Sequence, residues 1–173
     1  MRRLMLLRHA KSDRSPGVDD HERPLNDRGR TAAPLVGEYL ADHKLFPDLI
    51  LCSTSRRTRQ TCELLMAKLP KSTRVTFEET LYLAESDAIL ALARALPKAA
   101  GCVLLIGHNP GMQEAAVELA GSGDADARRR LNDKFPTAAL AVIDFSRDDW
   151  GAVRTRSGRL ERYVTPKTLA EAD

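Results

Sequence analysis

Two histidines and several arginines follow directly after short apolar runs in this chain of 173 residues. Arg8 and His9 follow the first run, His108 follows the run at 102–107, and an arginine-rich segment at 53–61 follows another. Guanidinium groups pair with phosphate oxygens through two parallel hydrogen bonds. A neutral imidazole is a competent nucleophile near pH 7, and arginines nearby would keep it neutral, since like charge disfavours imidazolium. These residue types therefore favour a pocket that holds a phosphoryl group and can attack it.

Apolar runs that alternate with segments of helical period indicate how these residues are positioned. The predicted strands are 3–7, 48–52, 74–77, 102–107, 139–145, 151–156 and 159–164. The predicted helices are 29–43, 56–68, 86–97 and 112–120. Such alternation predicts an α/β fold, a three-layer sandwich with a mostly parallel central sheet flanked by helices. Ligands of open α/β sheets bind at the carboxyl ends of the strands, so the histidines and arginines are expected in one pocket.

The bulk composition predicts a single domain over 1–173, with a frayed tail at about 166–173. Lys and Arg outnumber Asp and Glu by 27 to 24, a mild excess that does not require a nucleic acid partner. No apolar run approaches the roughly 20 residues that span a bilayer, so no membrane association is expected. The three cysteines are interpreted as buried thiols of a cytoplasmic protein. Without a long exposed apolar element, a monomer is expected.

Three segments resemble the motifs of the histidine phosphatase superfamily, whose fold is phosphoglycerate mutase-like. They are LLRHA at 6–10, STSRRTRQT at 53–61 and IGHNPG at 106–111. Within the superfamily the chain is most similar to the short SixA-type phosphohistidine phosphatases. That similarity rests on residues 8–12, on the Arg23-Pro24-Leu25 turn with Gly29, and on residues 134–137.

The resemblance implies a role for each motif residue. His9 would be the nucleophile that takes the phosphoryl group, without a metal or other cofactor. Arg8, Arg57 and His108 would hold the phosphate oxygens and stabilise the charge of the transition state. Arg57 is chosen because it stands three residues before the Gln-Thr of the second motif. Lys11 is either a fourth phosphate contact or a solvated loop lysine.

The sequence departs from the superfamily pattern at two positions. Ala10 replaces the usual glycine, and its methyl group is tolerable if that backbone is not left-handed. Relatives that cleave phosphoesters carry an acid shortly after the third strand, in a Leu-x-Glu pattern that places Leu83 at the acidic position here. The carboxylates nearby are Glu78, Glu79, Glu85 and Asp87, and none fits the pattern.

The missing acid favours a substrate with an N–P bond. An alkoxide has a conjugate acid with a pKa near that of water, about 15.7, and needs a proton donor to leave. A protonated phosphohistidine leaves as neutral imidazole and needs none. The resemblance therefore implies a phosphohistidine phosphatase acting on a phosphorylated protein, such as a phosphotransfer domain or a phosphocarrier.

Particular residues leave some other functions open and disfavour others. A small-molecule phosphomonoesterase with the same His9 chemistry and a phosphoprotein-binding module without turnover both remain alternatives. A cysteine-dependent phosphatase would need an arginine after five residues that follow its cysteine. Counted from Cys52, that position holds Thr58. A metallohydrolase would need histidines at ligand spacing, which this chain lacks. The Arg128–Arg130 run is either a docking patch for an acidic protein or a solvated helix face.

Overall fold

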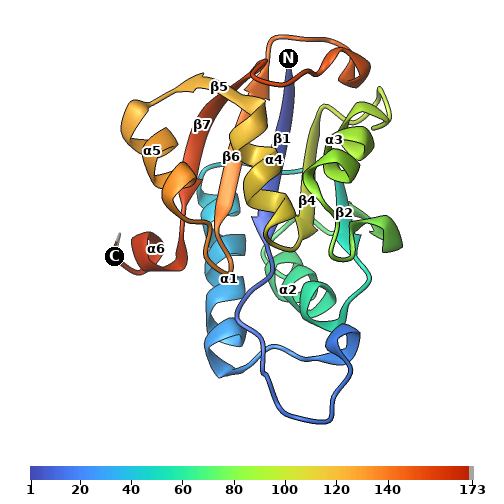
Figure 1. Cartoon of the computed structure of the whole chain (residues 1–173), viewed down its shortest axis with the longest axis vertical. Helices are drawn as coiled ribbons and strands as arrows, with labels where there is room; N and C mark the ends of the chain where they lie inside the picture. The colour runs from blue at the N-terminus through green and yellow to red at the C-terminus, as the bar shows by residue number, and fades with distance from the viewer. Residues whose placement is uncertain (172–173) are drawn as a thin grey trace.

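The computed structural model describes residues 1–171, which fold around one seven-stranded sheet with the order β3-β2-β4-β1-β6-β7-β5 (Figure 1). The strands are β1 (Arg2–Arg8), β2 (Leu49–Ser53), β3 (Arg74–Glu78), β4 (Cys102–Gly107), β5 (Ala120–Gly123), β6 (Leu140–Phe145) and β7 (Gly158–Val164). The α-helices are α1 (Asp27–Asp42), α2 (Arg56–Met66), α3 (Ser86–Arg94), α4 (Gly111–Leu119), α5 (Ala125–Asp133) and α6 (Pro166–Glu171). Short 3-10 helices are η1 (Asp20–Glu22), η2 (Glu79–Leu81) and η3 (Trp150–Ala152).

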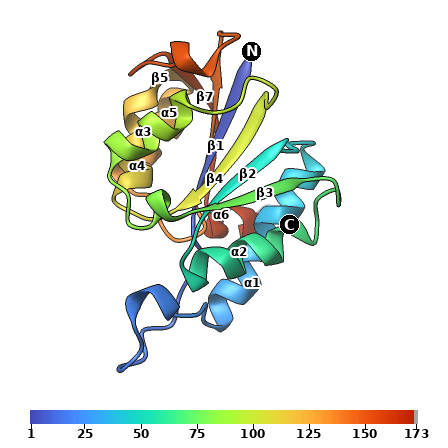
Figure 2. The same ribbon diagram turned by 90° about the vertical axis from the view of Figure 1, so that its right-hand side faces the viewer.

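The helices cover both faces of the sheet, which confirms the predicted three-layer α/β sandwich (Figure 2). Helices α1, α2 and α6 lie on one face, and α3, α4 and α5 lie on the other. Alternate residues of β1 enter the two cores: Leu4 and Leu6 join one, and Met5 and Leu7 join the other. Because both faces of this strand are buried, its sequence is a continuous apolar run.

The register of the sheet brings the predicted site residues together. Strands β1, β4, β2 and β3 are parallel neighbours, whereas β6 runs antiparallel to β1 and β7. Arg8, the last residue of β1, pairs with Gly107, the last residue of β4. His9 and His108 each follow one of these paired residues, so they leave the sheet at the same edge.

The strand predicted near the end of the chain was wrong. The strand expected at 151–156 is replaced by η3 and a turn, because the Asp149 side chain accepts a hydrogen bond from the Gly151 amide and starts a turn there. The tail expected to fray forms α6 over Pro166–Glu171. Its first turn is held by Thr165, whose hydroxyl accepts from the Thr168 amide at 3.3 Å. Residues 172–173 of that predicted tail lie outside the described part.

The helix predicted at 112–120 ends before Gly121 and Gly123, and neither β5 nor α5 is predicted from the sequence. These small residues instead form an edge strand beside β7. A Cβ atom on Gly121 would lie 1.9 Å from the carbonyl oxygen of Arg156, so only glycine fits this close approach. Asp124 then caps α5 by accepting a hydrogen bond from the Ala127 amide at 2.9 Å.

Gly29 couples helix α1 to the loop that follows β1. A Cβ atom at this position would lie 2.1 Å from the carbonyl oxygen of Lys11. We therefore expect Gly29→Ala to lower the free energy of unfolding by about 1–3 kcal/mol, the usual cost of overpacking. Urea denaturation measures the change. Gly101→Ala is the control, because the nearest atoms to its Cβ lie 3.8 Å away. Equal stability of the two variants would contradict this account of the loop.

Candidate active site

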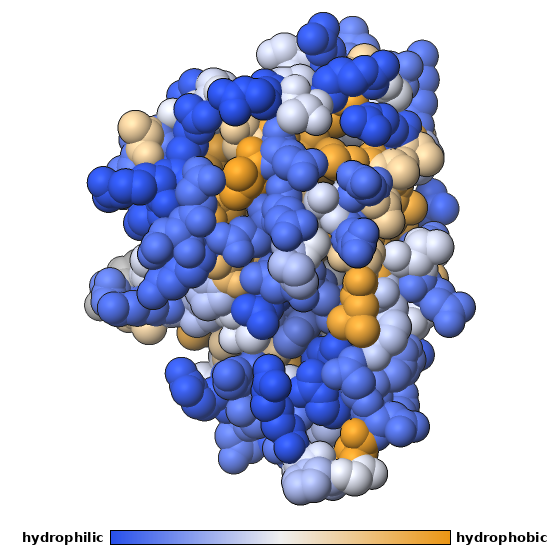
Figure 3. All heavy atoms as spheres, viewed as in Figure 1, coloured by the Kyte–Doolittle hydropathy of each residue, from blue (hydrophilic) through white to orange (hydrophobic). Residues whose placement is uncertain are grey.

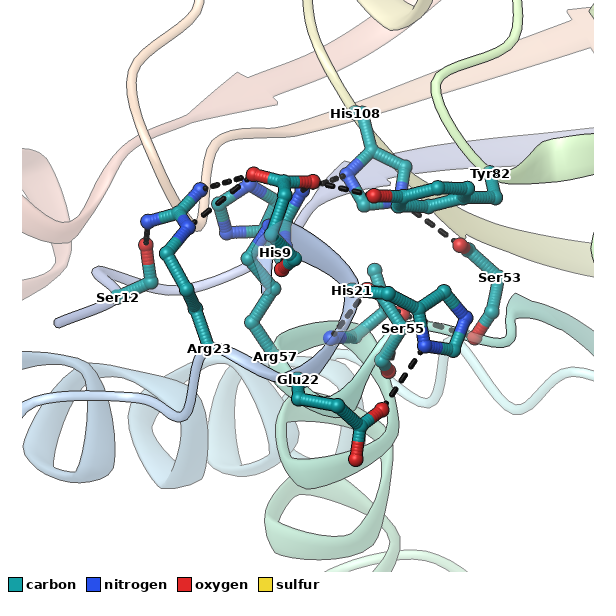
Figure 4. A network of polar contacts seen from close by, with 12 residues as sticks. His9, Ser12, His21, Glu22, Arg23, Ser53, Ser55, Arg57, Tyr82 and His108 are labelled. Atoms are coloured by element: carbon teal, nitrogen blue, oxygen red, sulfur yellow. Dashed lines mark hydrogen bonds and ion pairs between the residues drawn. The ribbon is translucent and has the colours of Figure 1, made fainter. Parts of the chain in front are cut away.

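All five site residues predicted from the sequence line one cavity of about 170 Å³ at the carboxyl ends of the parallel strands. Arg8, His9 and Lys11 follow or end β1, Arg57 lies in the first turn of α2, and His108 follows β4. The other lining residues are Ser12, Arg14, Asp20, Arg23, Leu83, Asn109 and Thr137. Figure 4 shows His9 and His108 near each other, with the Arg57 side chain beside them.

The imidazole of His9 is held in one tautomer. Its Nδ1 lies 2.7 Å from the carbonyl oxygen of Ala10, and a carbonyl only accepts hydrogen bonds. Nδ1 therefore carries the proton, and Nε2 keeps the lone pair that a nucleophile needs. Ala10 does not have a positive φ, so its methyl group replaces the usual glycine without backbone strain. Its amide donates to the Thr61 hydroxyl at 3.0 Å, which fixes the loop.

Burial keeps the His9 ring neutral. It lowers the pKa of His9 to about 3, and the nearby His108, Arg57 and Arg8 act in the same direction. The hydrogen bond to the Ala10 carbonyl opposes this lowering but is smaller. The arginines, predicted from the sequence to keep the ring neutral, contribute to this, but desolvation of the buried ring is the larger cause.

His108 faces His9 with the ring centroids 5.3 Å apart. Its Nε2 lies 2.8 Å from the hydroxyl of Ser53, which is fully buried, and its Nδ1 lies 3.4 Å from Nη2 of Arg57. Burial and the neighbouring Arg57 lower the pKa of His108 to about 3. Because a hydroxyl can donate or accept, Ser53 supports either tautomer of His108. The Arg57 guanidinium only donates, so Nδ1 accepts from it here; once that contact is released, Ser53 allows the neutral ring to take the tautomer that presents Nδ1–H to a phosphate oxygen.

The two arginines carry buried donors with no partner among the described residues. Arg57 is 2% exposed, and its Nε atom has no hydrogen bond; the Nε of Arg8 has none either. Leaving a buried donor unpaired costs about 1–3 kcal/mol, and more when the group is charged. An unsatisfied group of this kind in a cavity indicates a ligand. The free N–H groups suit the oxygens of a phosphoryl group.

Asp20 is a cavity residue that sequence analysis missed. Its carboxylate accepts hydrogen bonds from the Tyr82 hydroxyl, from Nη2 of Arg57 at 3.1 Å and from Arg23 at 3.0 and 3.1 Å. These bonds, Tyr82 first, lower the pKa of Asp20, so the carboxylate is ionised at neutral pH. The only sequence signal is its position three residues before Arg23, a residue of the SixA-like turn.

The entrance of the cavity holds two further residues named from the sequence. Lys11 is exposed and lies at the rim. Leu83 also lines the cavity, is 55% exposed and has a left-handed backbone with φ 52°. The four nearby carboxylates considered from the sequence, Glu78, Glu79, Glu85 and Asp87, are not among the described residues that line it. An apolar side chain therefore stands where the superfamily pattern has its acid.

Across residues 1–171, no helix is long and apolar enough to cross a bilayer. Within the same range, no group of three or more His, Cys, Asp or Glu side chains is placed to hold a metal ion.

The fold and the cavity define an α/β protein whose strand ends form a pocket of histidines and arginines. The sequence profile of the histidine phosphatase superfamily (branch 1) matches residues 4–85. A candidate phosphohistidine phosphatase SixA from Agrobacterium tumefaciens is similar to this chain. The two are 32% identical with a TM-score of 0.81, over 95% of this chain and 98% of that one. The chain therefore belongs to the histidine phosphatase superfamily, and its SixA-like neighbours indicate a phosphatase.

Two other relatives span the chain to a similar extent. A candidate SixA from Nakamurella multipartitia is 31% identical with a TM-score of 0.83, over 95% of this chain and 96% of that one. An uncharacterized protein of Mycobacterium leprae is 31% identical over 93% of this chain and all of its own length.

The burial of His9 and His108 has a direct spectroscopic consequence. Because burial disfavours the charged ring, both imidazoles are expected to stay neutral down to about pH 5, whereas an unperturbed histidine titrates near pH 6.5. NMR of ring-labelled protein from about pH 7.5 to about pH 5 measures this, with resonances assigned through His9→Gln and His108→Gln. A midpoint near 6.5 for His9 would contradict the cause given for its neutrality.

Ser53 is expected to position His108. Ser53→Ala removes the hydroxyl 2.8 Å from Nε2 and leaves the ring free to turn. We expect the kcat for an aryl phosphate to fall roughly tenfold or more, since a misaligned donor loses transition-state stabilisation. The circular dichroism spectrum should be unchanged. An unaltered kcat would show that His108 is held by its other contacts.

Proposed function

We propose that this protein hydrolyses phosphohistidine in a protein substrate through a covalent phosphohistidine on His9, without a metal ion. The observation that carries the proposal is Leu83, which lines the phosphate cavity where ester-cleaving relatives hold a proton donor. A pocket with a free imidazole nitrogen, buried arginine donors and no acid at that position suits a leaving group that departs without receiving a proton.

In the first step, Nε2 of His9 attacks the phosphorus atom of the substrate. The P–N bond of the substrate breaks, and its electron pair stays on the departing ring nitrogen. The substrate ring keeps the proton on its other nitrogen, so it leaves as neutral imidazole. His9, with its Nδ1–H bonded to the Ala10 carbonyl, becomes a phosphoimidazolium. Arg8, Arg57 and His108 hold the phosphoryl oxygens during the transfer.

In the second step, water attacks the phosphorus atom of phospho-His9. The P–N bond breaks toward the ring, which returns to the neutral tautomer with a proton on Nδ1. Both hydrogens of the water remain on the product as dihydrogen phosphate. The two steps are alike, because each breaks a bond between phosphorus and a protonated imidazole. No acid is needed in either one.

The polar groups around the cavity do not replace the missing acid. Asp20 is ionised, because its hydrogen bonds lower the pKa, and a carboxylate has no proton to give. The pKa of Tyr82 is raised by burial and by its hydrogen bond to Asp20, which makes the phenol a weaker acid. An alkoxide leaving group would therefore find no carboxylic acid among the described lining residues.

An open entrance supports a protein as the substrate. Only residues 67–73 separate α2 from β3, so no lid is inserted between them. The face shown in Figure 3 is mainly hydrophilic, including its lower part, where the loop after β1 lies. Two of the similar structures, at 31–32% identity, are described as candidate phosphohistidine phosphatases. A phosphotransfer domain or a phosphocarrier protein presents its phosphohistidine in a form that such an entrance admits.

The test of this function compares two substrates. Purified protein with a chelator present is incubated with a histidine-phosphorylated phosphotransfer domain and, in parallel, with an alkyl phosphate monoester. We expect phosphate release from the phosphohistidine protein only, and none from His9→Ala. Preferential ester hydrolysis would make the protein a small-molecule phosphatase. No turnover of either substrate would favour a phosphoprotein-binding module.

Leu83→Glu tests the reason for that preference. A glutamate at this position would supply a proton donor, so hydrolysis of the alkyl ester is expected to rise by about tenfold or more, within the range of general acid catalysis. Leu83→Gln is the matched control, because it has similar shape without a proton of comparable acidity. Equal ester hydrolysis by the two variants would contradict the role given to the missing acid.

A further inference from the structure

A carboxylate lies in a cavity built to hold a phosphoryl dianion. Asp20 is ionised and bonded to Arg57, the same guanidinium that is proposed to bind phosphate. By charge alone, a carboxylate in this place repels the substrate phosphate. Its presence therefore needs a reason other than phosphate binding.

Asp20 contacts the segment that carries Leu83, and both residues line the cavity. Its carboxylate accepts a hydrogen bond from the hydroxyl of Tyr82, and the next residue is Leu83, at the position where ester-cleaving relatives protonate the leaving group. Arg23 holds the other carboxylate oxygen at 3.0 Å and also donates to Ser12 at 2.8 Å. The carboxylate is thus fixed from two sides, and 47% of its side chain remains exposed to the cavity and solvent.

We propose that Asp20 is a specificity-determining residue whose carboxylate accepts the N–H of the protonated imidazole in a phosphohistidine substrate. The inference rests on the proposed function and deepens it. The carboxylate would do for the substrate ring what the Ala10 carbonyl does for His9, whose Nδ1–H it holds at 2.7 Å. Each ring in the transfer would then keep its proton against an acceptor of the protein.

The chemistry balances without proton transfer to the protein. The P–N bond forms at His9 Nε2 and breaks at the substrate nitrogen, whose bonding electrons stay on the ring. The proton remains on the other ring nitrogen, hydrogen-bonded to Asp20. A deprotonated phosphohistidine would instead leave as imidazolate, a far poorer leaving group. An opposite charge nearby favours the protonated ring, so the carboxylate selects the reactive form.

The substrate N–H would replace the hydrogen bond that Arg57 donates to the Asp20 carboxylate. Nη2 of Arg57 lies 3.1 Å from the carboxylate, a bond that weakens when the guanidinium turns to the phosphoryl oxygens. The groups that face Asp20 are Arg23 from its own loop, Arg57 from α2, Tyr82 after η2, and His108 after β4. Arg23 stays bonded to Oδ1 and Tyr82 to Oδ2, and Oδ2 accepts the substrate N–H at the position that Arg57 leaves.

The test measures kcat, at saturating substrate, of Asp20→Asn against a phosphohistidine protein and p-nitrophenyl phosphate, from about pH 6 to about pH 9, because the pH dependence of kcat reports ionisations in the enzyme–substrate complex. Nitrophenolate leaves without a proton and has no N–H. For phosphohistidine at alkaline pH we expect a loss of about ten- to a hundredfold, the effect of removing a charge-assisted hydrogen bond. The loss should shrink toward pH 6, because the ring is then protonated without help. The alkaline limb therefore moves to lower pH, while aryl ester hydrolysis does not fall.

Asp13→Asn is the matched control, because this carboxylate bonds Ser15 in the same loop and does not line the cavity. It should leave both activities unchanged. If Asp20→Asn lowered activity on both substrates equally, or left the pH profile unshifted, the inference would be overturned. Asp20 would then be a partner of Arg57 only. Failure of the unmodified protein on phosphohistidine would instead overturn the proposed function.

Discussion

The site depends on the burial of one guanidinium. Arg57 is 2% exposed, and a charge in such a place must be paired or hydrogen-bonded. Its partners come from elements far apart in the sequence: the backbone and side chain of Asp20 in η1, and the ring of His108 after β4. The loop after β1, the first turn of α2 and the end of β4 are therefore assembled around this one side chain.

The start of α2 is built to hold that side chain in place. Ser55 caps the helix by accepting a hydrogen bond from the Thr58 amide, and the Thr58 hydroxyl bonds the carbonyl of Ser53 at 2.8 Å. The same Ser53 bonds His108 through its own hydroxyl. Helix capping and histidine orientation are thus parts of one network (Figure 4), so the strand end, the helix start and the second imidazole cannot move independently.

The sequence predicts much of this arrangement, because local patterns encode it. Strands β1 and β4 are buried on both faces, so each is a continuous apolar run, and parallel pairing alone places His9 near His108. Among the arginines of the 53–61 segment, only the superfamily motif identifies Arg57 as the site residue. Asp20 could not be placed in advance, because its contact with Tyr82 joins residues 62 positions apart in irregular segments. The glycines of β5 likewise become a strand only through the close approach of Arg156.

Burial, more than nearby positive charge, keeps the His9 ring neutral. From the sequence, the arginines are the evident reason for a neutral ring. In the folded protein His9 is 6% exposed, and desolvation has the larger effect. The packing of the strand ends therefore keeps the proposed nucleophile neutral, and the arginines are left to bind the phosphoryl oxygens in the proposed reaction.

The absence of an inserted segment between α2 and β3 also bears on the lifetime of the intermediate. An enzyme that passes a phosphoryl group from one site to another must shield its phosphohistidine from solvent until the acceptor arrives. Here the cavity opens beside an exposed Leu83, and the connection from α2 to β3 is too short to form a cover. A phosphoryl group on His9 would meet water as soon as the leaving group departs. In the proposed reaction, such an architecture would favour hydrolysis over transfer.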